Sequence, residues 1–203
     1  MGFGRTPRSL YPRKTFAALS LTELASAALA DLGGVIAKMP DEAANDFIEA
    51  ILAAGRICLY GAGREGLALR GFAMRLFHMG LDAHVVADMT TPPVGAGDLL
   101  IVTAGQGWLP TAETFMKIAK DAGARTAIVT AQPAGRASKK ADVRLVIPAQ
   151  TLANDRGAKV SVLPMGSLFE ISEAIVFELI ILKLRDRVGE TADSMRARHT
   201  NLE

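Results

Sequence analysis

The sequence has few cysteines, few aromatic residues and little net charge, and each shortage narrows what the protein can be. A single cysteine excludes an internal disulfide framework, and no Cys/His cluster suggests a metal site. Aromatic residues make up only 5% of the chain, so aliphatic side chains must form most of the core. The formal net charge is +2 and no basic stripe is visible, which argues against nucleic-acid binding.

Long apolar runs are also missing. The most apolar segment, residues 174–184, is interrupted by Glu178 and Lys183 and is shorter than the roughly 20 residues that a membrane-spanning helix needs. The N-terminus has no long apolar run behind its basic residues, so it is a poor signal peptide. We therefore expect a soluble, cytoplasmic protein with no membrane partner.

Hydrophobic residues, by contrast, make up 50% of the 203 residues and follow alternating strand and helix patterns. The patterns predict strands at 56–60, 83–87, 98–103, 125–130 and 143–147. Helices are predicted between them, from the first strand to about residue 79, at 111–121 and at 134–140. This alternation predicts an α/β fold: a doubly wound five-stranded parallel sheet, in the order 2-1-3-4-5, flanked by helices.

The flanking segments are predicted to be helical or polar. Apolar residues recur at helical spacing over 21–32, and a second helix is predicted from Pro40-Asp41 to Leu52. Together they would form an N-terminal helical hairpin that packs on a core or on a partner subunit. A long apolar helix is predicted at 167–187. The expected domains are a flexible arm at 1–18, one α/β domain at 19–188, and a polar C-terminal tail at 189–203.

Two glycine-rich loops are predicted to meet where the winding of this sheet reverses. In the order 2-1-3-4-5 the reversal lies between the first and third strands, and ligands bind there, outside the carboxyl ends of the strands. The loop after the first strand contains Gly61-x-Gly63-x-x-Gly66, and the loop after the third spans 103–111. Backbone N–H groups in such loops can hold an anion at a helix N-terminus, so we expect a ligand pocket here.

The first loop also matches a dinucleotide-binding fingerprint. Its glycine spacing fits, and Asp88 closes the second strand, where an acidic residue could bind a ribose. However, Asp88 lies beyond the usual ~20 residues from the loop. It is equally well explained as a turn residue before 90–93, and no second, substrate-carrying domain is evident. Nicotinamide binding is thus the less favoured alternative, and we expect no cofactor.

Several short strings resemble the sugar isomerase (SIS) domain family, and within it the 6-phospho-3-hexuloisomerases. These strings are GAGR at 61–64, FAMRL at 72–76, TTPP at 90–93, PMGSLFE at 164–170 and RHTNLE at 198–203. The likeness runs from about residue 20 to the C-terminus. It implies an oligomer, a dimer or tetramer, that interconverts ketose and aldose phosphates through an enediol, without a cofactor. Its sites would lie at subunit interfaces.

The resemblance also implies roles for two residues. Glu170 matches the base that moves a proton between adjacent carbons. His199 matches a tail histidine that assists ring opening from a neighbouring subunit. Each has a structural alternative: Ser167-x-x-Glu170 fits a helix capping box, and a histidine in a polar tail is ordinarily exposed to solvent.

The two glycine loops depart from the pattern of that family, Gly-x-Gly-Arg-Ser-Gly and Ser-Gly-Ser-Gly-x-Thr. Here Glu65 replaces the serine of the first loop, and the second reads AGQGWL at 104–109, so its phosphate-binding hydroxyls are gone. A phosphate beside an ionised carboxylate loses several kcal/mol at an effective dielectric of about 20. Each lost hydroxyl donor removes roughly 1.5–3 kcal/mol. These losses weigh against a phosphate ligand.

Three functions therefore stay open: a phosphosugar isomerase, an isomerase of an unphosphorylated polyol or keto acid, and a non-catalytic sensor. Glu65 could turn outward, pair with Arg64, or read ligand hydroxyls together with Gln106, while Trp108 packs on an apolar face. Glu173 and Glu178 are expected to face solvent or polar groups of a partner, and Cys58 to be buried in the first strand. The predicted substrate-binding residues are Gly61, Gly63, Arg64, Glu65, Thr103, Gly105, Gln106, Gly107, Trp108 and Thr111.

Overall fold

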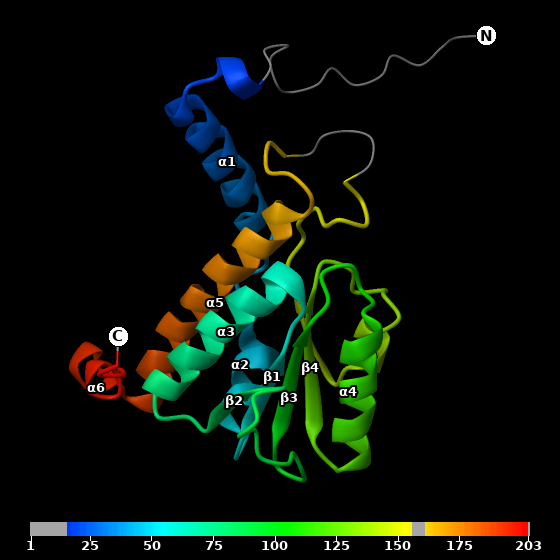
Figure 1. The fold of residues 1–203 in the computed structure, drawn as a ribbon, viewed down its shortest axis with the longest axis vertical. Coiled ribbons are helices and arrows are strands. Elements are labelled where there is room, and N and C mark those ends of the chain that lie inside the picture. Colours follow the sequence, from blue (N-terminus) through cyan, green and yellow to red (C-terminus); the bar gives the residue numbers. More distant parts are fainter. Residues whose placement is uncertain (1–15, 156–160, 203) are drawn as a thin grey trace.

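The computed structural model describes residues 16–155 and 161–202 and contains a five-stranded parallel sheet. Of the arm expected at 1–18, residues 1–15 lie outside the described residues. The strand order is β2-β1-β3-β4-β5, which confirms the predicted winding (Figure 1). The strands are β1 (Ile57–Tyr60), β2 (Ala83–Val85), β3 (Leu99–Thr103), β4 (Arg125–Thr130) and β5 (Val143–Val146).

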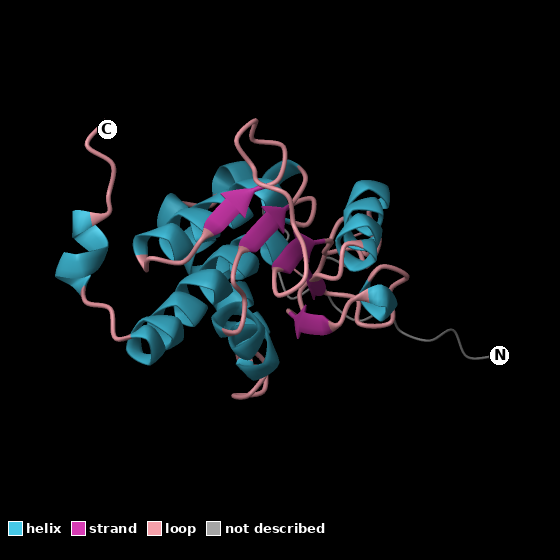
Figure 2. Cartoon of the chain, turned by 90° about the horizontal axis from the view of Figure 1, so that it is seen from below, coloured by secondary structure: helices cyan, strands magenta, loops and turns pink. Residues whose placement is uncertain are grey.

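Helices cover both faces of the sheet, as Figure 2 shows when the strands are viewed in a row. One face carries α2 (Asn45–Leu52), α3 (Gly63–His78) and α5 (Ser167–Val188), and the other carries α4 (Pro110–Asp121). The remaining helices are α1 (Leu21–Ile36), α6 (Ala192–Ala197) and the short 3-10 turns η1 (Phe16–Ala18) and η2 (Ser138–Lys140).

Two of the predicted helices are shorter than expected. The helix predicted at 134–140 is reduced to the single turn η2. The helix predicted to begin at Pro40-Asp41 begins at Asn45, because residues 41–44 form turns before it. The expected hairpin is also looser than a paired hairpin, since α1 packs on α5 while α2 packs on β5 and α5.

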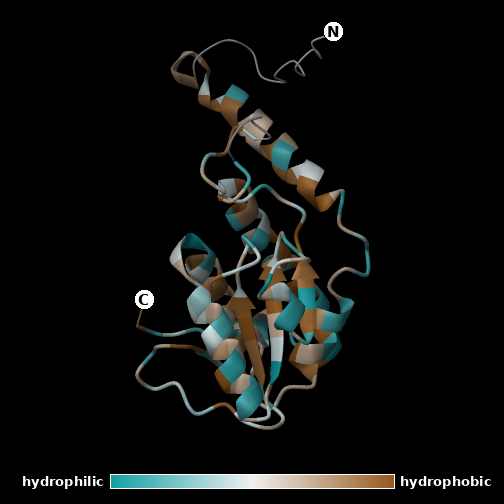
Figure 3. Ribbon diagram, turned by 90° about the vertical axis from the view of Figure 1, so that its right-hand side faces the viewer, coloured by the Kyte–Doolittle hydropathy of each residue, from teal (hydrophilic) through white to brown (hydrophobic). Residues whose placement is uncertain are grey.

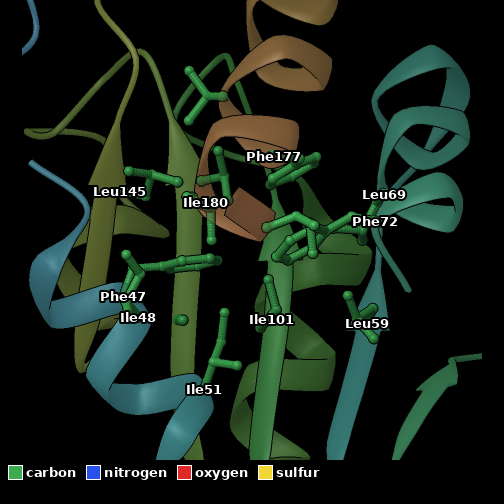
Figure 4. Packing of buried hydrophobic residues seen from close by; sticks show 14 of the residues in the cluster. Phe47, Ile48, Ile51, Leu59, Leu69, Phe72, Ile101, Leu145, Phe177 and Ile180 are labelled. Atoms are coloured by element: carbon green, nitrogen blue, oxygen red, sulfur yellow. The ribbon is translucent and has the colours of Figure 1, made fainter. Parts of the chain in front are cut away.

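The central strand β3 is buried along its whole length, which is why it is a nearly continuous apolar run, whereas the edge strand β2 is half-buried (Figure 3). Aligned neighbours such as Leu59 and Ile101 on β1 and β3 share a register and pack under α3 and α5. Above them Phe72 of α3 stacks on Phe177 of α5, with ring centroids 4.4 Å apart (Figure 4). Cys58 faces the α4 side and is buried, as expected.

The N-terminal half of α1 extends away from the rest of the fold (Figure 1). Ser20 and Glu23 form a reciprocal capping box that starts the helix, but Leu21 and Leu29 are 85% and 68% exposed. Only the far end is held: Asp31 accepts hydrogen bonds from Ser161 Oγ at 2.7 Å and from Val162 N–H at 2.9 Å. Residues 16–155 and 161–202 therefore leave the apolar stripe predicted over 21–32 largely uncovered.

The C-terminal tail is more ordered than its polar composition suggested. Residues 192–197 form α6, and Arg198 binds both carboxylate oxygens of Glu190 at 2.8 and 2.9 Å. Arg198 also donates to the carbonyl of His78 at 2.9 Å, which ties the tail to the C-terminal end of α3. Within the described parts of the chain, no helix combines the length and apolarity needed to span a membrane.

Removal of the Phe72 ring should show how much the α3–α5 contact contributes to stability. Phe72 is 2% exposed, whereas Ile118 on α4 is 54% exposed. We expect Phe72→Ala to lower the free energy of unfolding by about 3–5 kcal/mol because it leaves a cavity. Ile118→Ala should change it by less than about 1 kcal/mol. Urea denaturation of both variants measures this, and equal losses would contradict the assigned core.

Candidate active site

The two glycine loops and the first turn of α5 line a cavity of about 240 Å³. It lies at the carboxyl ends of β1 and β3, the position that the winding reversal predicts. The lining residues come from 62–65, from 104–106 with Trp108 and Leu109, from 151–152, and from 165–166 with Phe169 and Glu170.

The first loop is a tight turn that only glycine permits at two positions. A Cβ on Gly66 would lie 2.3 Å from the carbonyl oxygen of Gly61, and one on Gly61 would lie 2.8 Å from Gly66 Cα. Gly63 begins α3 with a φ of +57°. These contacts bring the N-terminus of α3 close to the end of β1, so the positive end of the helix dipole faces the cavity.

Glu65 turns inward, across the reversal, toward the second loop. Its Oε2 accepts hydrogen bonds from Thr103 Oγ1 at 2.8 Å and from the Gly105 N–H at 2.9 Å. Each such bond to a charged acceptor contributes roughly 1.5–3 kcal/mol. Burial raises the pKa of Glu65 above its ordinary value, although both hydrogen bonds lower it, and the charge of Glu170 raises it further. Glu65 therefore neither turns outward nor pairs with Arg64.

Arg64 instead joins the first loop to α5. Its Nε lies 3.0 Å from Glu170 Oε2, and its Nη1 donates to Ser167 Oγ at 3.0 Å. The capping box, the structural alternative for Ser167 and Glu170, does not form: Gly166 is the N-cap, with a φ of 82°, and the Ser167 hydroxyl accepts from Arg64. Because the Arg64 side chain is 59% exposed, the ion pair contributes at most about 1 kcal/mol.

The second loop supplies the rim of the cavity. Gly107 has a φ of +79° and no room for a Cβ, which would lie 2.6 Å from Gln132 Cβ. Trp108 is 49% exposed, and its Nε1 donates to Glu113 Oε2 at 3.1 Å. Gln106 is exposed at the cavity wall. Thr111 is not part of the lining, since its Oγ1 accepts from the Tyr60 hydroxyl at 2.8 Å.

Glu173 contradicts the sequence prediction, which placed it facing solvent or a partner. It is 0% exposed, and neither carboxylate oxygen has a hydrogen-bond partner among the described residues. Burial, and then the nearby charges of Glu65 and Glu170, raise the pKa of Glu173 well above its ordinary value. Its position on an apolar helix, one turn after Glu170, was the signal that could have predicted burial. Glu178 is exposed, as expected, and lies 3.5 Å from Arg75.

His199 lies away from this cavity in the same chain. Its ring is 5.2 Å from the ring of His78, at the C-terminal end of α3, whereas the cavity lies at the N-terminal end of that helix. The structure thus brings Glu170 together with the two loops and does not bring His199 there. A role for His199 requires the site of a neighbouring subunit.

The fold and site place the chain among proteins with a sugar isomerase domain. The sugar isomerase domain of an RpiR transcription factor from Sphaerobacter thermophilus superposes with a TM-score of 0.67, covering 87% of this chain and 94% of that one, at 17% identity. A Methanococcus jannaschii protein superposes with a TM-score of 0.74 at 28% identity, covering 91% of this chain and 100% of that one. The structure of that protein was taken to infer 3-hexulose-6-phosphate isomerase function. No family model matches the chain.

Sequence relatives narrow this class. The 3-hexulose-6-phosphate isomerase of Bacillus subtilis is 34% identical over 185 residues, covering 91% of this chain and 100% of the relative. The Mycobacterium gastri enzyme of the same name is 39% identical over 173 residues, covering 85% and 86%. The chain belongs to the 3-hexulose-6-phosphate isomerase family, a family of isomerases, which confirms the resemblance drawn from its sequence motifs.

Replacement of Glu173 tests its burial. The pKa of Glu173 in the folded state is raised well above its unfolded value near 4.5. Between these two values the folded state keeps a proton that the unfolded state loses, so the free energy of unfolding falls as pH rises from the unfolded pKa through the folded one. We expect Glu173→Leu to raise the free energy of unfolding by about 1–3 kcal/mol at pH 8, and by less at pH 5. Urea denaturation at both pH values measures this. Glu178→Gln is the exposed control, and parallel pH profiles for wild type and Glu173→Leu would contradict the prediction.

Proposed function

We propose that the protein is an aldose–ketose isomerase that moves a proton between adjacent carbons of a small sugar or sugar phosphate through an enediol. The observation that carries the proposal is the position of Glu170. Its side chain is 19% exposed and lines the cavity between the two glycine loops, and its carboxylate lies 3.0 Å from the Arg64 guanidinium. The membership of the chain in an isomerase family supports the reaction type.

The chemistry needs one base, and no external oxidant or reductant. The Glu170 carboxylate removes the proton from the carbon beside the substrate carbonyl, while the carbonyl oxygen takes up a proton, which gives an enediol. Return of a proton to the former carbonyl carbon, with loss of the proton from the neighbouring hydroxyl, exchanges the positions of carbonyl and alcohol. The Arg64 guanidinium, 3.0 Å from this base, supplies positive charge that stabilises the developing enediolate.

The proposed working form is a homo-oligomer, a dimer or tetramer. Large apolar side chains are exposed on three helices, α1, α3 and α5. They are Leu21 and Leu29 on α1, Leu67, Met74 and Phe77 on α3, and Leu179 and Leu182 on α5. Burial of such surface against a second copy removes apolar area from water. In such an assembly the tail of one subunit could bring His199 to the site of another, where it would assist ring opening.

Glu170→Gln tests the proposed base. The amide keeps the shape of the side chain but cannot accept the carbon-bound proton, so we expect turnover to fall by about 10²–10⁴-fold while ligand binding is retained. The assay follows aldose–ketose interconversion across a panel of sugars and sugar phosphates, with Glu178→Gln as the control of equal charge change. Full turnover by Glu170→Gln would exclude this base. Ligand binding without turnover by the wild-type protein would favour a sensor.

Leu182→Glu tests the proposed assembly. Leu182 is 51% exposed on α5, and a charge there would have to be buried in an α5 interface. We expect the wild-type chain to elute as a dimer or tetramer and Leu182→Glu to shift toward the monomer, by size-exclusion chromatography with light scattering. Met89→Glu, at a loop position that is 95% exposed, is the control. A wild-type monomer at all concentrations would contradict the assembly.

A further inference from the structure

Glu65 occupies the anion-binding position of its own site. The Gly105 N–H and the Thr103 hydroxyl converge where the two glycine loops meet, and both donate to Glu65 Oε2, at 2.9 and 2.8 Å. These donors are of the type that holds a phosphate oxygen in glycine-rich loops. In this chain they are already engaged by a carboxylate that the protein itself supplies.

The fit of the carboxylate is close. A Cβ on Gly105 would lie 2.9 Å from Glu65 Oε1 and 2.7 Å from the ring of Phe169. The absence of a side chain at Gly105 is therefore what lets Glu65 reach the backbone of the second loop. Both described hydrogen bonds engage Oε2, which leaves the lone pairs of Oε1 for a hydroxyl donor.

The charges around the cavity do not favour a second anion. Among the described lining residues, Arg64 is the cation and Glu65 and Glu170 are the anions, and Arg64 is already paired with Glu170. Two further cations near the rim, Arg136 and Lys140, form ion pairs with Glu113. A phosphate at the loops would thus meet the Glu65 charge without an unpaired cation in the described lining to offset it.

We propose that Glu65 determines substrate specificity: it closes the loop site to phosphate, and the substrate presents an uncharged, hydroxyl-bearing end there. A hydroxyl donates to Glu65, the exposed amide of Gln106 hydrogen-bonds a second polar group, and the half-exposed ring of Trp108 packs against the C–H face of the ligand. The substrate class is an unphosphorylated polyhydroxy ketose or aldose. This inference rests on the proposed isomerase function and deepens it, since the same cavity holds Glu170.

The test is direct binding, measured by calorimetry on the full-length protein with D-fructose, D-fructose 6-phosphate and inorganic phosphate as probes. The wild-type protein should bind the phosphate ester no more tightly than the free sugar, and should not bind inorganic phosphate at millimolar concentration. Glu65→Ser removes the carboxylate and restores a hydroxyl. It should bind the ester and inorganic phosphate at least tenfold more tightly than wild type. Glu178→Gln, the same loss of charge on the exposed face of α5, should leave all three affinities unchanged.

A second variant keeps the result decisive if Glu65→Ser fails to fold. Glu65→Gln keeps the side-chain length and an oxygen that can accept from Thr103 and Gly105, but removes the charge. It should also gain phosphate affinity. A tenfold preference of the wild-type protein for the ester overturns the proposal, and so does the absence of any gain in a folded Glu65 variant. The readout is affinity for the three probes, and repeating it in the Glu170→Gln background removes turnover, so these outcomes are separate from the Glu170→Gln activity assay.

Discussion

The structure of the site depends on one interaction, the hydrogen bonding of Glu65 to Thr103 and Gly105. It joins the loop after β1 to the loop after β3 at the winding reversal of the sheet, where the connections that follow these two paired strands lead to opposite faces and a cavity forms between them. The close approach of Gly61 and Gly66 sets the start of α3, and so the position of Glu65. Removal of the carboxylate would leave a buried N–H and a buried hydroxyl in need of another acceptor.

Three glutamates surround this gap in three different electrostatic situations. Glu65 accepts two hydrogen bonds, Glu170 is paired with Arg64, and Glu173 has no hydrogen-bond partner among the described residues. Burial, and then the charges of Glu65 and Glu170, raise the pKa of Glu173 well above its ordinary value, so the protonated form is favoured at the most buried of the three positions.

The sequence predicted the sheet well because its signals are local and repeated. Apolar runs bounded by glycine mark buried parallel strands, and five of them separated by helices leave few possible topologies. The position of the cavity followed from that topology. The direction of Glu65 did not, because a carboxylate beside a glycine loop can turn outward, pair with Arg64 or cross to the next loop. Only the three-dimensional position of the Gly105 N–H decides among these.

Two local readings of α5 differ from the structure, for different reasons. Ser167 and Glu170 fit a local capping pattern, the alternative to a base, but Arg64, 103 residues away from Ser167, donates to the hydroxyl, and Gly166 caps the helix instead. Here a long-range contact outweighs a local preference, as is expected where elements converge on a functional site. The prediction for Glu173 followed its charge rather than the apolar helix that carries it, and was wrong.

The loops and the base carry different information about function. The family membership of the chain and the position of Glu170 both concern the proposed reaction, because proton transfer between adjacent carbons needs a base beside the substrate carbon. Recognition of the remote end of the substrate is a separate matter, since a fold can keep its chemistry while its loops change what they bind. In the proposed specificity, replacement of loop hydroxyls by Glu65 and Gln106 alters recognition and leaves the proposed base in place. On that proposal an isomerase family acquires a new substrate without rebuilding the helix that carries its base, and the change is concentrated in the two loops that meet at the reversal.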